Sequence, residues 1–158
     1  MQRIIKFRGL TANGDMVYGY LVPDLPDSTV YYKEYSQRIC WYEGQAHHNI
    51  PVKNGTVGEY TGLKDSNARE IYEGDILLAE DEYTDRILDD GTGPREPLNH
   101  LAPVEFHDGS FGITISNRGD NYSEGFWPFD RILNDIGDTP SEMEVIGNIY
   151  ENKELLDD

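Results

Sequence analysis

The sequence predicts an all-β protein, and three observations carry this prediction. Eight prolines and 16 glycines among 158 residues interrupt the chain too often for long helices. Two dipeptides typical of tight hairpin turns, Asn13-Gly14 and Asp108-Gly109, stand between runs of alternating apolar residues. Aromatic and β-branched residues, which favour strands, fill much of the remaining chain. We expect an N-terminal β subdomain over residues 1–57 and an SH3-like small barrel over residues 58–158, with one short C-terminal helical turn.

Residues 3–22 form the first predicted hairpin. A two-residue Asn13-Gly14 loop places Phe7 opposite Tyr20 and Ile5 opposite Val22. Because side chains alternate between the faces of a strand, these four residues and Tyr18 are expected on one face.

An aromatic strand is predicted over residues 30–44. Its candidate interface residues are Tyr31, Tyr32, Tyr35, Trp41 and Tyr42. They fall on both faces of an alternating strand, so neither face is purely polar. We hypothesise that this strand forms or supports a subunit interface, because aromatic residues are enriched where two protein surfaces meet. The alternative is that both faces pack inside one subunit.

The same aromatic residues also admit stacking of single-stranded nucleic acid, since Lys33 and Arg38 lie among them. Glu34 and Glu43 dilute that charge, and most of the chain is acidic. The sequence therefore argues against nucleic acid as the partner.

The second half begins with a predicted short strand over residues 75–79. Residues 80–103 hold seven acids, three prolines and two glycines, and are expected to form an acidic loop insertion. In the hairpin over residues 103–116, the Asp108-Gly109 turn pairs Phe106 with Phe111 and Val104 with Ile113. A last strand is predicted over residues 143–150, followed by a helical turn with Asn152 as its N-cap.

No residue set points to catalysis, a cofactor or a metal. His47-His48 is expected in a loop, and adjacent side chains of an extended chain point to opposite sides, which disfavours joint ligation of one ion. His107-Asp108 resembles a base and its orienting carboxylate, but the sequence marks no nucleophile to go with it. We therefore expect a protein that is not an enzyme.

The charge is strongly negative and uneven. The chain carries −17 at pH 7. Residues 1–58 hold six Lys and Arg against five Asp and Glu, a net of +1, whereas residues 59–158 hold seven against 25, a net of −18. Such an acidic half is either a solvated surface or a surface that meets a basic partner.

The chain has one cysteine, Cys40, so no internal disulfide can form. The first ten residues include three basic side chains and no apolar signal region, and no apolar run approaches the ~20 residues of a membrane span. These features predict a cytoplasmic protein without a membrane contact.

Four segments resemble the YopX family of phage and prophage proteins. They are "IKFRG" (5–9), "EYTGLKDSNAREIYEGDIL" (59–77), "VEFHDGSFGI" (104–113) and "EVIGNIYENKELL" (144–156). The family signature residues, which we interpret as structural, are Tyr60, Gly62, Leu63, Asp65, Gly74, Asp75, Gly147 and Asn148. Two positions depart from the family pattern: Ala68 stands where a turn glycine is usual, and Lys153 where a proline is usual.

The resemblance implies a β-rich fold with an SH3-like barrel, a phage or prophage origin and a homo-oligomer in the host cytoplasm. It implies no reaction and no catalytic residue. The resulting hypothesis is a non-enzymatic binding or assembly protein, with itself or a host protein as partner. The alternative hypothesis is an acidic decoy that resembles DNA and occupies a basic host protein.

Overall fold

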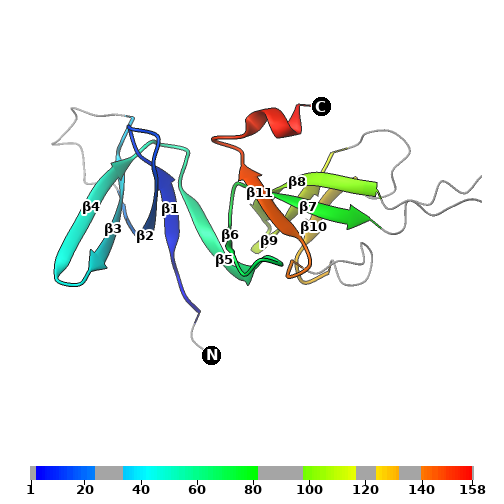
Figure 1. The fold of residues 1–158 in the computed structure, drawn as a ribbon, viewed down its shortest axis with the longest axis horizontal. Helices are drawn as coiled ribbons and strands as arrows, with labels where there is room; N and C mark the ends of the chain where they lie inside the picture. The colour runs from blue at the N-terminus through cyan, green and yellow to red at the C-terminus, as the bar shows by residue number, and fades with distance from the viewer. Residues whose placement is uncertain (1–2, 24–33, 82–97, 117–123, 132–139, 158) are drawn as a thin grey trace, which may run out of the picture. The chain divides into compact units, whose positions relative to one another are not determined.

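The computed structural model describes residues 3–23, 34–81, 98–116, 124–131 and 140–157, and over these residues the predicted all-β class is confirmed (Figure 1). The strands are β1 (Phe7–Leu10), β2 (Met16–Val22), β3 (Gln37–Glu43), β4 (Ala46–Val52), β5 (Gly58–Lys64), β6 (Glu70–Tyr72), β7 (Asp75–Asp81), β8 (Leu98–His107), β9 (Ser110–Ile115), β10 (Gly125–Pro128) and β11 (Glu144–Asn148). A single 3-10 turn, η1 (Lys153–Leu156), follows β11.

The chain divides into two compact units, Met1–Gly62 and Leu63–Asp158. The boundary lies inside β5, a few residues beyond the boundary that the sequence suggested after residue 57. The first unit contains strands in the order β4-β3-β2-β1-β5, and the end of β5 continues into the second unit, where it pairs with β6. All pairs with a stated register are antiparallel, as expected for strands joined by short turns.

One side of the first-unit sheet, which carries Ile39 and Val52 and which we call the inner side, is tightly packed. Ile39 and Val52 are fully buried. Gly9 makes this approach possible, because a Cβ at Gly9 would lie 2.8 Å from Val52 carbon atoms. Only glycine therefore fits at this point of β1.

The predicted register of the first hairpin is wrong by one residue. Phe7 pairs with Gly19 and Leu10 with Met16, so the loop has three residues rather than two. The Thr11 hydroxyl accepts a hydrogen bond from the Asp15 N–H at 3.1 Å. The Thr11 N–H donates to the Asp15 carbonyl at 2.9 Å, and the Gly14 N–H donates to the Thr11 carbonyl at 3.1 Å. Gly14 has φ 89° and Asn13 does not have a positive φ, which gives a type I turn followed by a left-handed residue.

The one-residue shift changes which side chains share a face. Phe7 lies on the opposite side of the sheet from Tyr18 and Tyr20, which pair with Arg8 and Cys40 respectively. The expected common face of Ile5, Phe7, Tyr18, Tyr20 and Val22 is therefore not formed, because a shift of one residue reverses every side chain of a strand.

The histidine pair lies in a strand, contrary to the predicted loop. His47 and His48 belong to β4, where they pair with Tyr42 and Trp41 across the β3–β4 hairpin. The turn of this hairpin is the two-residue Gly44-Gln45 loop, in which Gly44 has φ 60°. Glycine at the first central position favours this tight hairpin, and the prediction missed it because the segment lacks an Asn-Gly or Asp-Gly signal.

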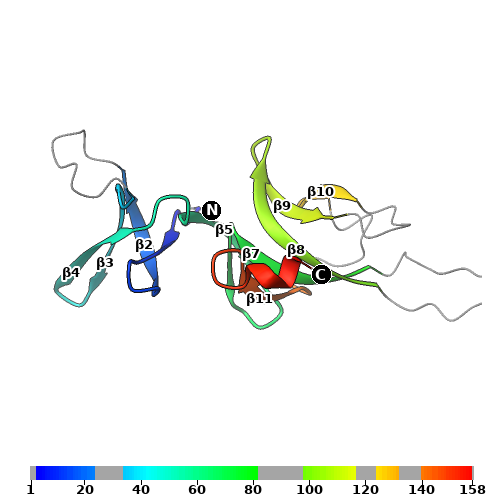
Figure 2. The ribbon, with the colours of Figure 1, turned by 90° about the horizontal axis from the view of Figure 1, so that it is seen from above.

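The second unit contains a five-stranded sheet in the order β10-β9-β8-β7-β11. The strands β7 to β10 follow one another as a meander, and β11 returns to pair with β7 (Figure 2). Among the described strands β10 and β11 remain the two edges, so the sheet is open and does not close into the expected SH3-like barrel. Its core is built from Ile71, Leu77, Ala79, Ala102, Val104, Ile113, Ile115, Phe129, Met143 and Val145.

The register of the second hairpin is confirmed. Val104 pairs with Ile113 and Phe106 with Phe111, whose ring centroids lie 4.9 Å apart. Asp108 and Gly109 form the turn with φ 50° and 87°, both positive as a type I′ turn requires.

The acidic insertion is shorter than predicted. β7 continues to Asp81 and β8 begins at Leu98, and these two residues pair with each other. Residues 80–81 and 98–103 are therefore strand rather than loop, because the ladder of hydrogen bonds extends past the apolar part of each strand. Residues 82–97 lie outside the described part of the chain.

The C-terminal turn η1 follows Asn152, but the Asn152 side chain forms no capping hydrogen bond. Its Oδ1 instead accepts a hydrogen bond from the Asn148 N–H at 3.2 Å. The expected N-cap is thus replaced by a bond back to β11, and η1 lies beside β8.

Candidate aromatic interface

One side of the first-unit sheet exposes a group of tyrosines. Tyr18 and Tyr20 of β2 and Tyr42 of β3 are 44%, 63% and 70% exposed. Tyr20 pairs with Cys40, which is two residues from Tyr42 on the same strand, so these rings share one side of the sheet. We call this side, with Arg38 and His47, the tyrosine face.

Ring contacts hold parts of the tyrosine face in place. Tyr42 and His47 are cross-strand neighbours whose ring centroids lie 4.8 Å apart. Lys6 Nζ lies 5.9 Å from the centre of the Tyr18 ring, within the range of a cation–π contact. The rings are thus partly ordered before any partner binds, which reduces the entropy lost on binding.

The charges of the tyrosine face are positive. Arg38 is exposed on it, and Lys6 reaches Tyr18. In the described strands of the first unit, the two carboxylates are those of Glu43 and Glu59. By the strand register, both point to the side of the sheet opposite to the tyrosine face. A protein with net charge −17 therefore carries one aromatic face on which cations prevail.

The structure separates the predicted interface residues. Tyr31 and Tyr32 lie outside the described residues, and Tyr35 is half-buried before β3. Trp41 is on the inner side, stacked on His48 with ring centroids 4.7 Å apart and planes at 11°. Of the five, Tyr42 lies on the tyrosine face.

Tyr18 and Tyr20 are the interface candidates that the sequence did not supply. The two-residue turn assigned to Asn13-Gly14 placed them on a common face with Ile5 and Phe7. Thr11 before the turn was the available signal, since a threonine hydroxyl can bind the closing N–H and lengthen the loop.

The signature residue Asp65 organises the turn between β5 and β6. Its Oδ1 accepts hydrogen bonds from the N–H groups of Asn67 and Arg69 at 2.9 and 2.8 Å, and its Oδ2 from Val145 N–H at 3.0 Å. Asp65 is 4% exposed. Burial alone raises the pKa of this carboxyl, but the three N–H donors and the charge of Arg69 outweigh it and lower the pKa below its ordinary value.

The Asp65 turn is also fixed to β11. Arg69 Nη1 donates to the Val145 carbonyl at 2.8 Å, and the Ser66 N–H donates to the Met143 carbonyl at 2.9 Å. Ala68, at the position where a glycine is usual, has φ 62°. These contacts hold an alanine in a conformation that glycine adopts more easily.

The signature residues around Gly74 hold a second turn. Asp75, 2% exposed, accepts a hydrogen bond from the Tyr72 N–H at 2.8 Å. Gly74 has φ 84°, and a Cβ there would lie 3.0 Å from the Tyr150 ring. Its N–H donates to the Val104 carbonyl and its carbonyl accepts from the Ile149 N–H, which connects three segments of the second unit.

The remaining signature residues lie in β5 and β11. Tyr60 is buried, Gly62 has φ 87°, and Leu63 is 38% exposed. Asn148 Oδ1 accepts from the N–H groups of Tyr150 and Glu151, both at 3.0 Å. Gly147 leaves room for Asn152, whose Oδ1 would lie 2.6 Å from a Cβ at that position. The polar signature side chains thus bind backbone groups of their own unit.

A small polar cluster lies on the second-unit sheet. Glu105 Oε2 accepts a short hydrogen bond from the Thr114 hydroxyl and lies 3.0 Å from His107 Nε2. Burial raises the pKa of Glu105, but the Thr114 hydrogen bond and the His107 contact outweigh it and lower the pKa. The Glu105 carboxylate thus contacts both the Thr114 hydroxyl and the His107 imidazole.

His107 therefore binds Glu105 rather than Asp108. Its ring also contacts Phe126 edge-on at 4.6 Å. The interpretation of His107-Asp108 as a base and its orienting carboxylate has no support from these contacts.

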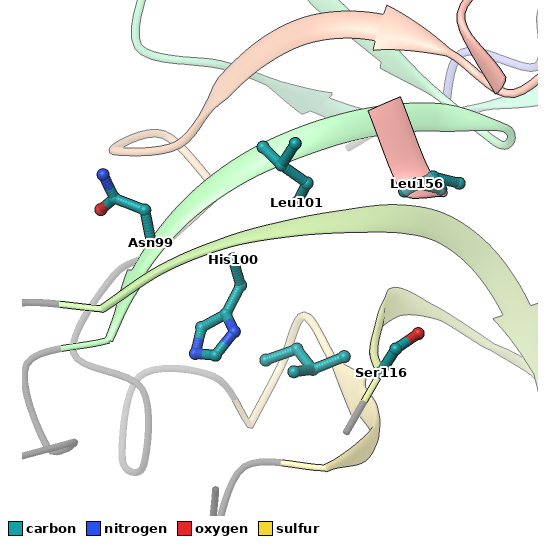
Figure 3. Close-up of a pocket in the computed structure, with 6 residues that line it drawn as sticks. Asn99, His100, Leu101, Ser116 and Leu156 are labelled. Carbon is teal, nitrogen blue, oxygen red and sulfur yellow. The ribbon is translucent and has the colours of Figure 1, made fainter. Parts of the chain in front are cut away.

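A pocket of about 30 Å³ lies between β8, the end of β9 and η1 (Figure 3). It is lined by Asn99, His100, Leu101, Ile115, Ser116 and Leu156. This volume accommodates one or two water molecules rather than a substrate.

Over the described residues, no group of three or more His, Cys, Asp or Glu side chains gathers in a way that could hold a metal ion. None of the helices in this part of the chain is long and apolar enough to cross a membrane.

The fold and the site define a class: an all-β protein of two units, with a tyrosine face on one and a network of buried polar turns in the other. Residues 6–157 match the family described as "YopX protein". The match covers nearly the whole chain, and the chain belongs to this family.

No curated protein matches the chain. Among solved structures, the chain is similar to one described as "Crystal structure of protein EF1440 from Enterococcus faecalis". The sequence identity is 23%, the similarity covers 98% of this chain and 99% of the other, and the TM-score is 0.46.

Proposed function

We propose that this member of the YopX family is a non-enzymatic binding and assembly protein whose contact surface is the tyrosine face. The observation that carries the proposal is the exposure of Tyr18, Tyr20 and Tyr42 on one side of a sheet, at 44%, 63% and 70%. Large rings with a polar tip are the side chains most often found at the centre of protein interfaces.

The second unit has a supporting role in this proposal. Its buried polar residues, including Asp65, Asp75 and Asn148, bind backbone N–H groups and shape turns. This chemistry builds a rigid platform. The partner is a second copy of the chain, a host protein, or both, and the setting is the cytoplasm of a bacterium that carries the phage or prophage.

Light scattering on the full chain tests the proposal. Tyr20→Ser with Tyr42→Ser should weaken association with the partner by at least about tenfold, since exposed interface tyrosines are frequent hot spots. Tyr20→Phe with Tyr42→Phe is the matched control, because it retains both rings and should retain most of the association. Unchanged association in the serine variant, with an unchanged circular dichroism spectrum, would contradict the proposal.

A second candidate function is an acidic decoy, favoured by the net charge of −18 over residues 59–158. A dense set of carboxylates competes with nucleic acid for basic proteins. Capture from host lysate separates the two functions. A decoy should retain basic nucleic-acid-binding proteins in both tyrosine variants and release them on adding competitor DNA, whereas the tyrosine-face partner should be lost in the serine variant alone.

A further inference from the structure

A second exposed aromatic site lies at the β8–β9 turn in the second unit. Phe106 is 48% exposed and packs against Phe111 with ring centroids 4.9 Å apart. In Figure 2 this turn projects beyond the ends of β7 and β10. The exposed ring of Phe106 at this projecting turn is available for contact with another surface.

The charge at this turn is opposite to the charge of the tyrosine face. Asp108 follows Phe106 in the exposed turn, whereas Glu105 points to the opposite face of the hairpin with His107 and Thr114. Residues 104–115 include no Lys or Arg. The hydrogen bond from Thr114 and the contact with His107 favour the ionised form of Glu105. We call residues 105–111 the acidic hairpin tip.

We propose that the tyrosine face of one copy binds the acidic hairpin tip of another copy, so that the protein associates head to tail. This inference rests on the proposed function and names the partner of the tyrosine face. Phe106 would pack among Tyr18, Tyr20 and Tyr42, and Asp108 would lie near Arg38 and Lys6. Apolar contact and opposite charges then act together at one interface.

Charge favours this arrangement over a symmetric one. Two tyrosine faces placed against each other would bring Arg38 and Lys6 of both copies together. The carboxylates of the described first-unit strands, Glu43 and Glu59, point to the other side of the sheet and would not separate these cations. Two acidic tips would likewise repel each other. Like charges across an interface disfavour a pairing, whereas the head-to-tail pairing opposes unlike charges.

A head-to-tail contact uses two different surfaces of each copy, and this predicts a distinctive mixing result. One variant, Tyr20→Ser with Tyr42→Ser, disrupts the tyrosine face and leaves the acidic hairpin tip unchanged. The other, Phe106→Ser with Asp108→Asn, loses the tip and retains the face; asparagine tolerates the positive φ of Asp108. Full-length proteins are measured by sedimentation at a range of concentrations, each with circular dichroism to verify folding.

Each variant alone should be monomeric where the wild type associates, with association at least about tenfold weaker. An equimolar mixture should form a heterodimer and nothing larger, because each copy has one working surface. Raising the salt concentration from about 0.15 to 0.5 M should weaken the heterodimer several-fold, since the exposed charges are screened.

Other outcomes would overturn the inference in separable ways. If the tip variant alone associates as the wild type does, the interface does not use the tip, while the proposed role of the tyrosine face stands. If the face variant alone associates as the wild type does, the proposed function fails as well. A monomeric wild type that binds fluorescent oligothymidine, with binding lost in the face variant, would assign the tyrosine face to nucleic acid and overturn self-association.

Discussion

The β1–β2 turn of the first unit and the β5–β6 turn of the second unit have the same hydrogen bonds built from different residues. The turns are Thr11-Ala12-Asn13-Gly14-Asp15 and Asp65-Ser66-Asn67-Ala68-Arg69. In both, the N–H of the first residue donates to the carbonyl of the fifth, and the side-chain oxygen of the first accepts from the N–H of the fifth. In each, the fourth residue has a positive φ, 89° for Gly14 and 62° for Ala68.

The two turns differ in what holds them. The Thr11 hydroxyl accepts one N–H from its own turn, whereas the Asp65 carboxylate accepts two from its turn and a third from β11. We call the hydrogen-bonding side chain at the first position, Thr11 or Asp65, the tether of its turn. The turn with the single hydroxyl hydrogen bond has glycine at the position with positive φ, and the turn with the buried, charged carboxylate tolerates alanine there. The comparison teaches that the side chain at the first position decides how much strain the fourth can hold.

Removing the tether of the second turn should have the largest effect. Asp65→Ala leaves three backbone N–H groups without their acceptor in a buried site, and we expect the free energy of unfolding to fall by about 3 kcal/mol or more. Urea denaturation measures the loss. Asp65→Asn, which retains one acceptor oxygen, should lose less, and equal losses would mean that charge rather than hydrogen bonding dominates.

Acid should weaken the second turn and leave the first unaffected. The pKa of Asp65 is lowered in the folded protein, so its stabilisation is present above the ordinary carboxyl pKa and is lost as the pH falls through the folded pKa. The Tm of the wild type should therefore drop more steeply below about pH 4 than the Tm of Asp65→Asn. Parallel Tm curves for the two proteins would contradict this assignment; Glu105, whose pKa is also lowered, contributes equally to both.

Removing the tether of the first turn should have a smaller effect. Thr11→Val retains the shape of the side chain and removes the hydroxyl that binds the Asp15 N–H. We expect a loss of about 1 kcal/mol, measured by the same denaturation. A loss as large as that of Asp65→Ala would erase the distinction between the two turns.

Exchanging the residues at the strained position should give the smallest and most diagnostic effects. Ala68→Gly removes the left-handed alanine and should stabilise the protein by up to about 1 kcal/mol, although glycine also gains freedom in the unfolded chain. Gly14→Ala should destabilise by about 1 kcal/mol. Opposite signs in thermal denaturation would support the comparison, and a destabilising Ala68→Gly would refute the strain at this turn.

The hairpins show how far the sequence could predict the fold. At Asp108-Gly109 both turn residues have the positive φ that a two-residue turn requires, so the dipeptide alone predicted the pairing of Phe106 with Phe111. At Asn13-Gly14 the Thr11 hydroxyl changes the loop length, and the dipeptide rule gave the wrong register. The all-β class survived this error because it depends on composition and turn frequency rather than on one register.

The candidate site was predicted less well than the fold, because it depends on the registers of individual strands. Trp41 and Tyr42 follow each other in the sequence, but only the pairing of β3 with its neighbours decides that Tyr42 faces solvent and Trp41 stacks on His48. Tyr20 joins Tyr42 through its pairing with Cys40 on the adjacent strand, which no local pattern specifies. A surface assembled from several strands depends on every register at once.

The pairing of Asp81 with Leu98 has a practical consequence for protein engineering. The ladder brings the two ends of the segment between β7 and β8 to within about 5.5 Å, the ordinary spacing of paired strands. The entropy of closing a loop rises only slowly with its length, so residues 82–97 can be exchanged for a foreign domain whose termini are close together. We expect a reporter domain inserted there to leave both β sheets intact, which offers a permissive labelling site away from the two termini.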